Sequence, residues 1–282
     1  MKSPPIVPRN LALKLAKLTA AKKYQDVVNI ISTFPDNGRS SWGEAAKKFI
    51  PFLLDRSIAA PYRIFTKGNS KLPFYSFSNL PIVNCPGKGE CVKWCYSLKA
   101  WQYPFAFFRQ LQNTILVNEQ SPQLVDAFNK LPRNTDVRLY VDGDFNSAAT
   151  LEFWFKLISD RSDLKVYGYS KSWELFLDYF NAGKLFPSNY VLNLSSGSKY
   201  DNFGPTRAAM QQLPITRGEF VAINAPRNSS TQSLKQIAQT FGMKKIFVCP
   251  GQCGSCIKKQ GKNVHACGSK LLKGTTVVIQ TH

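Results

Sequence analysis

The sequence lacks several patterns that would define a class of protein at once. It has no run of about 18 uncharged apolar residues, which argues against a conventional membrane span. Its first residues carry no apolar segment followed by small residues, so no secretory signal is evident. It also has no Gly-Lys-Ser/Thr phosphate loop, no Gly-x-Ser-x-Gly motif and no His-Glu-x-x-His motif. Hydrolase and phosphate-loop functions therefore have no support, and we expect a cytoplasmic protein without a membrane partner.

Acidic residues are scarce and unevenly placed. The chain has 37 Lys and Arg against 17 Asp and Glu, a formal net charge of +20. Residues 220–282 contain no acid and nine basic residues, and residues 1–25 contain no acid and six basic residues. Such blocks suit a polyanion, because each neutralised phosphate releases counterions. A basic face that only keeps the protein soluble is the alternative. Nucleic acid is the predicted partner, and the predicted contact residues are Lys258, Lys259, Lys262, Lys270 and Lys273.

Histidine is nearly absent, whereas seven cysteines fall into two compact groups. The first group is Cys85, Cys91 and Cys95, and the second is Cys249, Cys253, Cys256 and Cys267. An odd number of thiols cannot all pair within one chain. Together with the lack of a signal, this favours thiolate metal ligands in a reducing cytosol over a disulfide framework.

The first cysteine group has the spacing Cys-x5-Cys-x3-Cys on a loop with Pro86, Gly87 and Gly89. The glycines allow the backbone to fold tightly, so that three sulfurs come within reach of one centre. A structural zinc site normally needs four protein ligands, and the only histidines, His265 and His282, are far along the chain. A [4Fe–4S] cluster with one iron free of protein ligands fits better. Zinc and no metal at all remain as alternatives.

The second group offers four thiols, a complete set for structural zinc or for a fully ligated iron–sulfur cluster. His265 is adjacent and could replace Cys267 as a ligand. A role in fixing the end of the chain to the rest of the fold is at least as well supported as electron transfer.

Short strands alternate with helices along most of the chain, which predicts parallel βαβ units in an α/β fold. Right-handed crossovers would wind them into an open doubly wound sheet or a partial barrel. Helices before them predict an N-terminal helical extension at 1–58, followed by a βα domain with both cysteine groups at 59–282. The predicted strands are 74–78, 137–141, 165–169, 190–194, 220–223 and 245–248.

Polar residues follow several of these strands, where parallel α/β folds carry their sites. Asp142-Gly143-Asp144 could hold an ammonium group or a metal-bound water, or act as a base. An Asx turn that caps the next helix is the alternative. Lys171 could pair with a carboxylate or phosphate, and Asn193 and Ser195 follow a neighbouring strand.

The order strand, cysteine loop, helix, strand, acidic glycine motif resembles the radical S-adenosylmethionine (SAM) enzymes. The resemblance implies a partial (βα)6 barrel in which Cys85, Cys91 and Cys95 ligate a [4Fe–4S] cluster, with Trp94 as the aromatic residue that commonly precedes the last cysteine. It further implies that Asp142-Gly143-Asp144 takes the place of the motif that holds the SAM amine. Asn193 or Ser195 would then face the ribose, and the second cysteine group would be an auxiliary site.

A second resemblance covers roughly residues 60–260. Cys85-Pro-Gly-x-Gly-x-Cys91-x3-Cys95-Tyr96, the later Asp-Gly-Asp-Phe and Tyr-x-Tyr-Ser-Lys-Ser are similar to the gene-product-88 proteins of phages and plasmids. This resemblance implies an origin in a mobile element.

The favoured interpretation is an iron–sulfur protein of phage or plasmid type, similar to radical SAM enzymes, that acts on or binds nucleic acid. Its catalytic candidates are Asp142, Asp144 and Lys171. The alternative is a non-catalytic DNA-binding protein, acting in replication or its control, with structural metal sites. A binding module that holds only zinc is a third possibility.

Overall fold

The computed structural model describes residues 9–38, 41–68, 72–200, 204–251, 253, 256–259 and 262–281. Within these ranges an eight-stranded sheet has the order β1-β2-β3-β4-β5-β6-β10-β7. From β2 to β7 along this sheet each pair of neighbouring strands is parallel, and β1 is antiparallel to β2. The strands are β1 Thr66–Lys67, β2 Tyr75–Ser76, β3 Asp136–Leu139, β4 Lys165–Ser170, β5 Tyr190–Ser195, β6 Thr216–Ile223, β7 Ile246–Val248 and β10 Thr276–Gln280. The predicted α/β class with a parallel sheet is confirmed.

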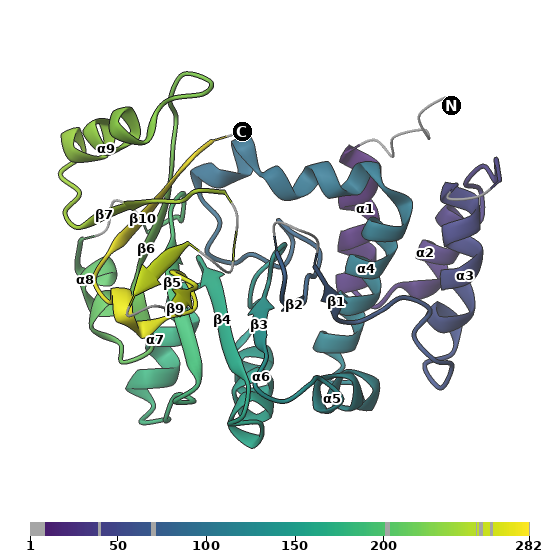
Figure 1. Ribbon diagram of the computed structural model, residues 1–282. Coiled ribbons are helices and arrows are strands. Elements are labelled where there is room, and N and C mark those ends of the chain that lie inside the picture. Colours follow the sequence, from purple (N-terminus) through teal and green to yellow (C-terminus); the bar gives the residue numbers. More distant parts are fainter. Residues whose placement is uncertain are drawn as a thin grey trace.

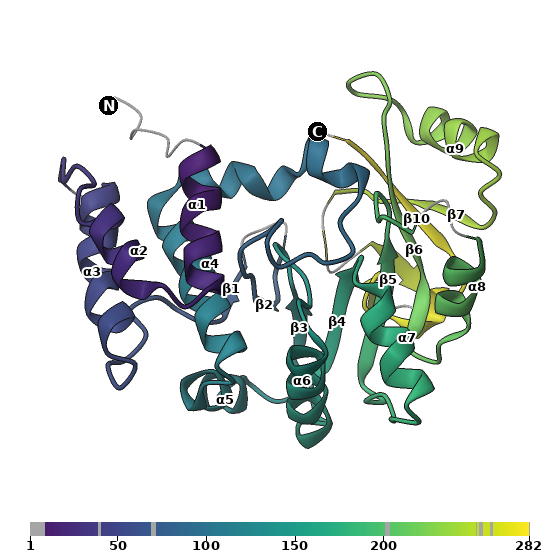
Figure 2. The same cartoon turned by 180° about the vertical axis from the view of Figure 1, so that it is seen from behind.

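Helices alternate with the strands, and α6, α7 and α8, which connect neighbouring strands, cover one face of the sheet, as right-handed crossovers place them. Figure 2 shows α6, α7 and α8 side by side on this face. The helices are α4 Pro104–Asn118, α5 Pro122–Asn129, α6 Ala148–Asp160, α7 Trp173–Asn181, α8 Gly204–Gln212 and α9 Thr231–Thr240.

The two faces of the sheet differ because successive side chains of a strand point to opposite sides. On β3, Val137 and Leu139 enter the main apolar core beneath the helices. On β4, Tyr167 belongs instead to a second cluster on the other face, with Phe74 and Cys267. The segment that carries the second cysteine group thus packs on the face opposite the helices. This segment forms a short hairpin of β8 Ile257–Lys259 and β9 Lys262–Val264, and in Figure 1 β9 lies in front of β5.

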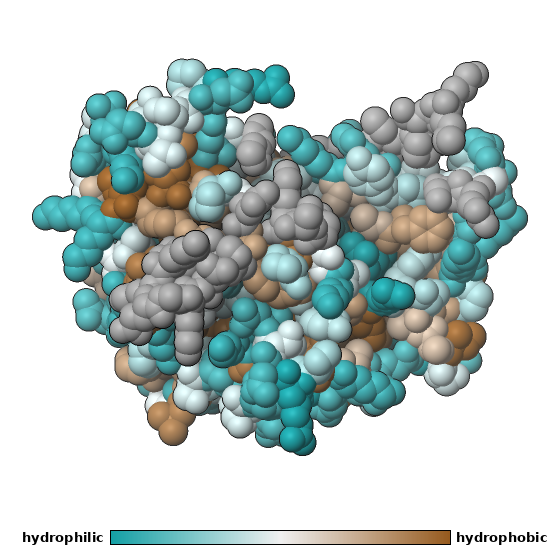
Figure 3. Space-filling model, in the orientation of Figure 1, coloured by the Kyte–Doolittle hydropathy of each residue, from teal (hydrophilic) through white to brown (hydrophobic). Residues whose placement is uncertain are grey.

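The sequence analysis missed one strand at the end of the sheet that carries β6 and β7. β10 was not predicted, and it lies between β6 and β7, pairing in parallel with both. A third apolar cluster joins β10 to α9 through Val278, Leu234 and Ala238. In Figure 3 the strongest apolar colouring of the visible face lies near α9 and β7, at the upper left.

The N-terminal helices are α1 Arg9–Ala20, α2 Tyr24–Ile31 and α3 Trp42–Leu54. The predicted N-terminal helical extension therefore has a break between α1 and α2, where Lys22 has a φ of 56°. Ser41 caps the start of α3, because its hydroxyl accepts from the Glu44 N–H at 3.0 Å. These helices share one apolar core with the sheet. No helix in the described residues is long and apolar enough to cross a membrane.

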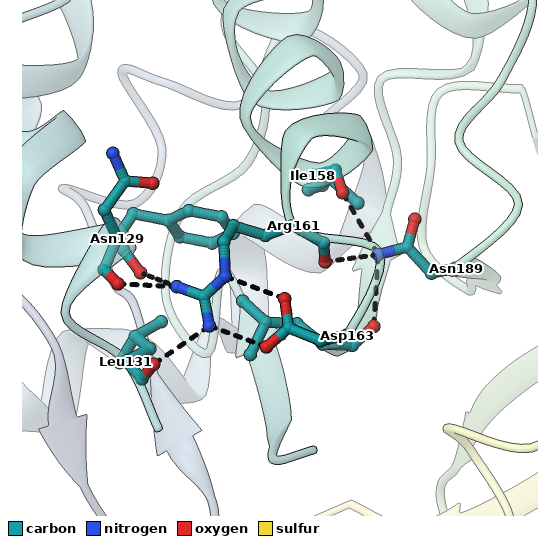
Figure 4. A network of polar contacts seen from close by, with 8 residues as sticks. Asn129, Leu131, Ile158, Arg161, Asp163 and Asn189 are labelled. Carbon is teal, nitrogen blue, oxygen red and sulfur yellow. Dashed lines mark hydrogen bonds and ion pairs between the residues drawn. The ribbon is translucent and has the colours of Figure 1, made fainter. Parts of the chain in front are cut away.

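Figure 4 shows a network of polar contacts around Arg161 and Asn189, near the amino ends of β4 and β5. The Arg161 guanidinium donates to both oxygens of Asp163 at 2.8 Å and to the carbonyls of Asn129 and Leu131. The Asn189 amide donates to three carbonyls, one in the last turn of α6 and two in the loop between α6 and β4. Together these contacts hold the amino ends of β4 and β5 in register.

Replacing Phe49 tests whether α3 is an integral part of the core. Phe49 is fully buried, and its ring centroid lies 5.4 Å from that of Phe108 on α4. We expect Phe49→Ala to lower the free energy of unfolding by about 3–5 kcal/mol in denaturant titration. Leu54→Ala on the same helix is the control: its side chain is exposed, and a change within about 0.5 kcal/mol is expected. Equal effects of the two substitutions would contradict a shared core.

Candidate functional site

A cavity of about 100 Å³ lies where the polypeptide leaves the carboxyl ends of β3, β4 and β5. It brings together the three cysteines of the first group with several of the predicted polar residues. Its lining includes Cys85, Cys91, Cys95, Gly143, Asp144, Lys171 and Ser195. Residues more than 100 positions apart in sequence therefore share one small space.

Main-chain contacts hold the cysteine loop at this end of the sheet. The N–H groups of Gly89 and Cys91 both donate to the Gly197 carbonyl, at 3.1 and 3.2 Å. The Lys199 N–H donates to the Gly87 carbonyl at 3.0 Å. A Cβ atom at Gly87 would lie 1.5 Å from the Lys171 carbonyl oxygen, so only glycine allows this approach.

The first three thiols lie close enough to affect one another electrostatically. Burial raises the pKa of the Cys85 thiol, and the negative charges of Asp144 and Cys95 raise it further. Burial also raises the pKa of Cys95, with an added contribution from Cys91. Three neighbouring thiolates are thus unfavourable without a cation between them. Within the described ranges, no three His, Cys, Asp or Glu side chains are arranged to hold a single metal ion.

Asp144 is buried and points into the end of β4. Its carboxylate accepts hydrogen bonds from the Ser170 hydroxyl and from the N–H groups of Lys171 and Phe145, each at 2.8 Å. Burial raises the pKa of Asp144, while these donors act in the opposite direction by stabilising the charged form.

Asp142 does not line the cavity. Its carboxylate accepts from the Gln110 side chain of α4 at 2.9 Å, and burial is the main cause that raises its pKa. Gly143 separates the two aspartates with a φ of +83°, in the left-handed region. The turn therefore directs the two carboxylates to different places.

Lys171 and Ser195 meet in the cavity, where the Lys171 Nζ donates to the Ser195 hydroxyl at 2.7 Å. Asn193 lies elsewhere, buried on the face that carries the second cysteine group. Its amide donates to the carbonyls of Gly168 and Cys267, and its oxygen accepts from Arg217 at 2.5 Å. Asn193 therefore ties the sheet to the second group and does not line the cavity.

The second cysteine group is also electrostatically coupled. Burial raises the pKa of Cys267 to about 11, and the Tyr169 hydroxyl, which bonds to its sulfur, acts in the opposite direction. Charge on Cys249 raises the pKa of Cys253 and Cys267, and charge on Cys256 raises that of Cys249 and Cys253. All four thiols are thus within interaction range of at least one other thiol of the group.

His265 lies beside this group with its ring between two aromatic rings. Its centroid is 4.7 Å from that of Phe74 and 4.5 Å from that of Tyr167. Neither ring nitrogen has a hydrogen-bond partner among the described residues. Burial lowers the pKa of His265 to about 4, so the imidazole is neutral near pH 7.

Sequence reasoning did not find three further cavity residues: Arg138, Tyr169 and Phe220. The Arg138 guanidinium lies 4.5 Å over the Tyr169 ring, whose centroid is 4.7 Å from that of Phe220. Burial alone would lower the pKa of Arg138, but nearby tyrosines and Cys253 raise it overall, so the cation persists. The signal was an arginine alternating with Val137 and Leu139 in a buried strand.

The predicted nucleic-acid residues lie apart from the cavity where the structure describes them. The Lys270 Nζ donates to the carbonyl of Ser188, which precedes β5, and Lys273 precedes β10. Both are exposed and lie toward the amino ends of the strands, opposite the cysteine cavity. Lys273 lines a separate cavity of about 550 Å³ with Arg207 and Lys244. The side chains of Lys258, Lys259 and Lys262 lie outside the described part of the chain.

Fold and site together define a mostly parallel α/β protein with a cysteine-lined cavity at the carboxyl ends of its strands. Residues 55–270, more than half of the chain, match the Gene product 88 family, and the protein belongs to that family. The family predicted from the cysteine loop is confirmed, and the match begins directly after α3. No curated protein and no solved structure gave a match.

Gly87→Ala tests the close approach of the cysteine loop to the strand ends. Its methyl group would overlap the Lys171 carbonyl, which is main chain and has little room to move. We expect a loss of about 1–3 kcal/mol in the free energy of unfolding, measured in denaturant. Gly204→Ala is the control, because a Cβ there meets nothing within 4 Å. An unchanged Gly87→Ala protein would show that the loop is held differently.

Proposed function

We propose that this protein is an iron–sulfur protein similar to radical SAM enzymes, with a partial βα barrel, that acts on a nucleic acid or nucleotide in a reducing cytoplasm. The observation that carries the proposal is the shared cavity of the three cysteines with Asp144, Lys171 and Ser195. In parallel α/β folds the carboxyl ends of the strands are where such chemistry takes place.

The donor set fits a cluster better than a single ion. Neighbouring thiols with raised pKa values lose protons readily only beside a strong positive charge, which iron supplies. In a [4Fe–4S] cluster each cysteine binds a different iron, so the sulfurs need not converge on one point. Three cysteines leave one iron without a protein ligand, and when bound the cluster supplies electrons to a molecule such as SAM at that position.

The protein's own side chains suggest how SAM would be oriented. The Asp144 carboxylate is the cavity's candidate partner for the SAM ammonium group, since Asp142 points toward α4. The Ser195 hydroxyl is the candidate for the ribose, since Asn193 faces the second cysteine group. The Lys171 ammonium could bind a carboxylate beside them.

The second group would hold a separate, fully ligated site. Cys249, Cys253, Cys256 and Cys267 offer four thiolates for an iron–sulfur cluster or for zinc. His265 is the alternative to Cys267 as the fourth ligand, since its nitrogens have no partner among the described residues.

A second candidate function is non-catalytic nucleic-acid binding by a protein of phage or plasmid origin, with both metal sites structural. The observation that favours it is the acid-free, basic stretch from residue 220 to 282, of which Lys270 and Lys273 are exposed. Phosphate contacts by such lysines bind a strand without reading its sequence.

Metal analysis tests the first proposal. Anaerobically purified protein should contain about eight irons with matching sulfide, or about four irons and about one zinc. Its EPR spectrum after reduction should change when SAM is added. Cys91→Ser should remove the response to SAM and about four irons, whereas Cys253→Ser should reduce metal at the second site and keep the response. Zinc alone, or iron without any response to SAM, would end the catalytic proposal.

Salt dependence tests nucleic-acid binding. We expect affinity for a single-stranded oligonucleotide to fall steeply with salt. The double variant Lys270→Glu/Lys273→Glu should weaken binding and reduce the slope of log K against log salt by about 1.4, because two phosphate contacts to a single strand are lost. Lys130→Glu/Lys156→Glu makes the same charge change at exposed positions on the helix side. If both double variants lower affinity equally, only net charge matters and these two lysines do not define a contact surface.

A further inference from the structure

We propose that the cysteine cavity binds a phosphate group of its substrate, a nucleotide, and that the Arg138 guanidinium anchors this phosphate. The inference rests on the proposed function to the extent that it names the substrate class for the same cavity. Its evidence is the guanidinium of Arg138, unpaired among the described residues, a side chain that has no role in the proposed metal sites.

Arg138 is a cation that makes no ion pair in the described part of the chain, and its charge acts on the pKa of Asp142 from beyond ion-pair distance. It lies on β3 and points away from the helices, into the cavity. Its Nε is buried and has no hydrogen-bond partner, and no carboxylate of the described residues lies within ion-pair distance. A buried charge left unpaired is costly, so such a group is retained where a ligand completes it.

Apart from the three cysteines, the charged side chains that line the cavity are mostly positive. Lys88, Arg138 and Lys171 line it, and Asp144 is the one carboxylate among the lining residues. The Asp144 oxygens already accept three hydrogen bonds from other groups. The two lysines contact a carbonyl and a hydroxyl, which leaves their charges for other partners.

Arg138 is held in one orientation, which suits specific recognition. Its guanidinium stacks on Tyr169, whose hydroxyl bonds to Cys267 and whose ring packs against Phe220. A planar guanidinium fixed in this way presents a rigid pair of donors that matches two phosphate oxygens.

The surroundings favour a nucleotide as the source of the phosphate. Trp94 and Tyr96 line the cavity and are 42% and 50% exposed, so their rings are open to stacking by a base. Lys88, Lys93 and Lys99 belong to the same loop, where Glu90 is the only acid. A phosphate in the cavity would thus have an aromatic surface nearby for its base.

Calorimetric titration of the metal-loaded full chain tests the inference. The probes are inorganic phosphate, deoxyadenosine monophosphate, a short single-stranded oligonucleotide and SAM. We expect the nucleotide to bind the unmodified protein and to bind Arg138→Gln about tenfold to a hundredfold more weakly, because charged hydrogen bonds are lost. Arg133→Gln, an exposed site with the same charge change, should bind as the unmodified protein does. A stronger response to the oligonucleotide than to the monophosphate would identify a strand as the source.

Other results would overturn the proposal that Arg138 anchors a phosphate. Equal nucleotide affinity of the unmodified protein and Arg138→Gln would overturn the inference. So would a loss confined to SAM, or a loss of metal from the second cysteine group, since Arg138 would then serve SAM or the Cys253 thiolate. If Arg138→Gln does not fold, Arg138→Lys is the second variant. It keeps the positive charge but lacks the planar pair of donors, so it should still weaken nucleotide binding severalfold. Nucleotide binding through Arg138 in a protein that does not respond to SAM would retain this inference and reject the radical mechanism.

Discussion

The site depends on main-chain contact between the cysteine loop and the turns that follow β4 and β5. Hydrogen bonds to the Gly197 carbonyl place the backbone of the loop, and glycine at position 87 lets it reach the Lys171 carbonyl. The loop's position is therefore set by strand ends and by the absence of side chains. The sulfurs need not bond to one another to be brought together, which is the arrangement that a metal-binding loop requires.

The parallel sheet separates two kinds of surroundings. One face supplies an aromatic and aliphatic core beneath the helices. The other presents arginine and tyrosine side chains to the segment that carries the second cysteine group. Tyr169 connects the two cysteine groups, because it lines the first cavity and bonds to the sulfur of Cys267. A structural change at either cysteine group would thus alter the position of Tyr169 and, through it, the surroundings of the other group.

Much of this arrangement was predictable from local sequence. Alternating strands and helices indicated the parallel α/β class, and glycine beside closely spaced cysteines indicated a tight loop at a strand end. The separation of Asp142 from Asp144 was not predictable, because it depends on a left-handed turn at Gly143 and on the position of Gln110 in α4. Asn193 likewise could be placed near a strand end, but the face to which it points is decided by distant Cys267 and Arg217. The run Val277, Val278 and Ile279 is typical of a strand, so β10 itself could have been predicted. Its position between β6 and β7 depends on contacts distant in sequence and could not.

That insertion has a consequence for the order of assembly. Among the described strands, β7 pairs with β10 alone, so its pairing in the sheet must wait for a strand that is synthesised later. The second cysteine group lies in the connection between these two strands. Its thiols are therefore gathered in the same late step that completes this edge of the sheet. The gathering of these thiols and the closure of the sheet edge are therefore coupled, so that each stabilises the other.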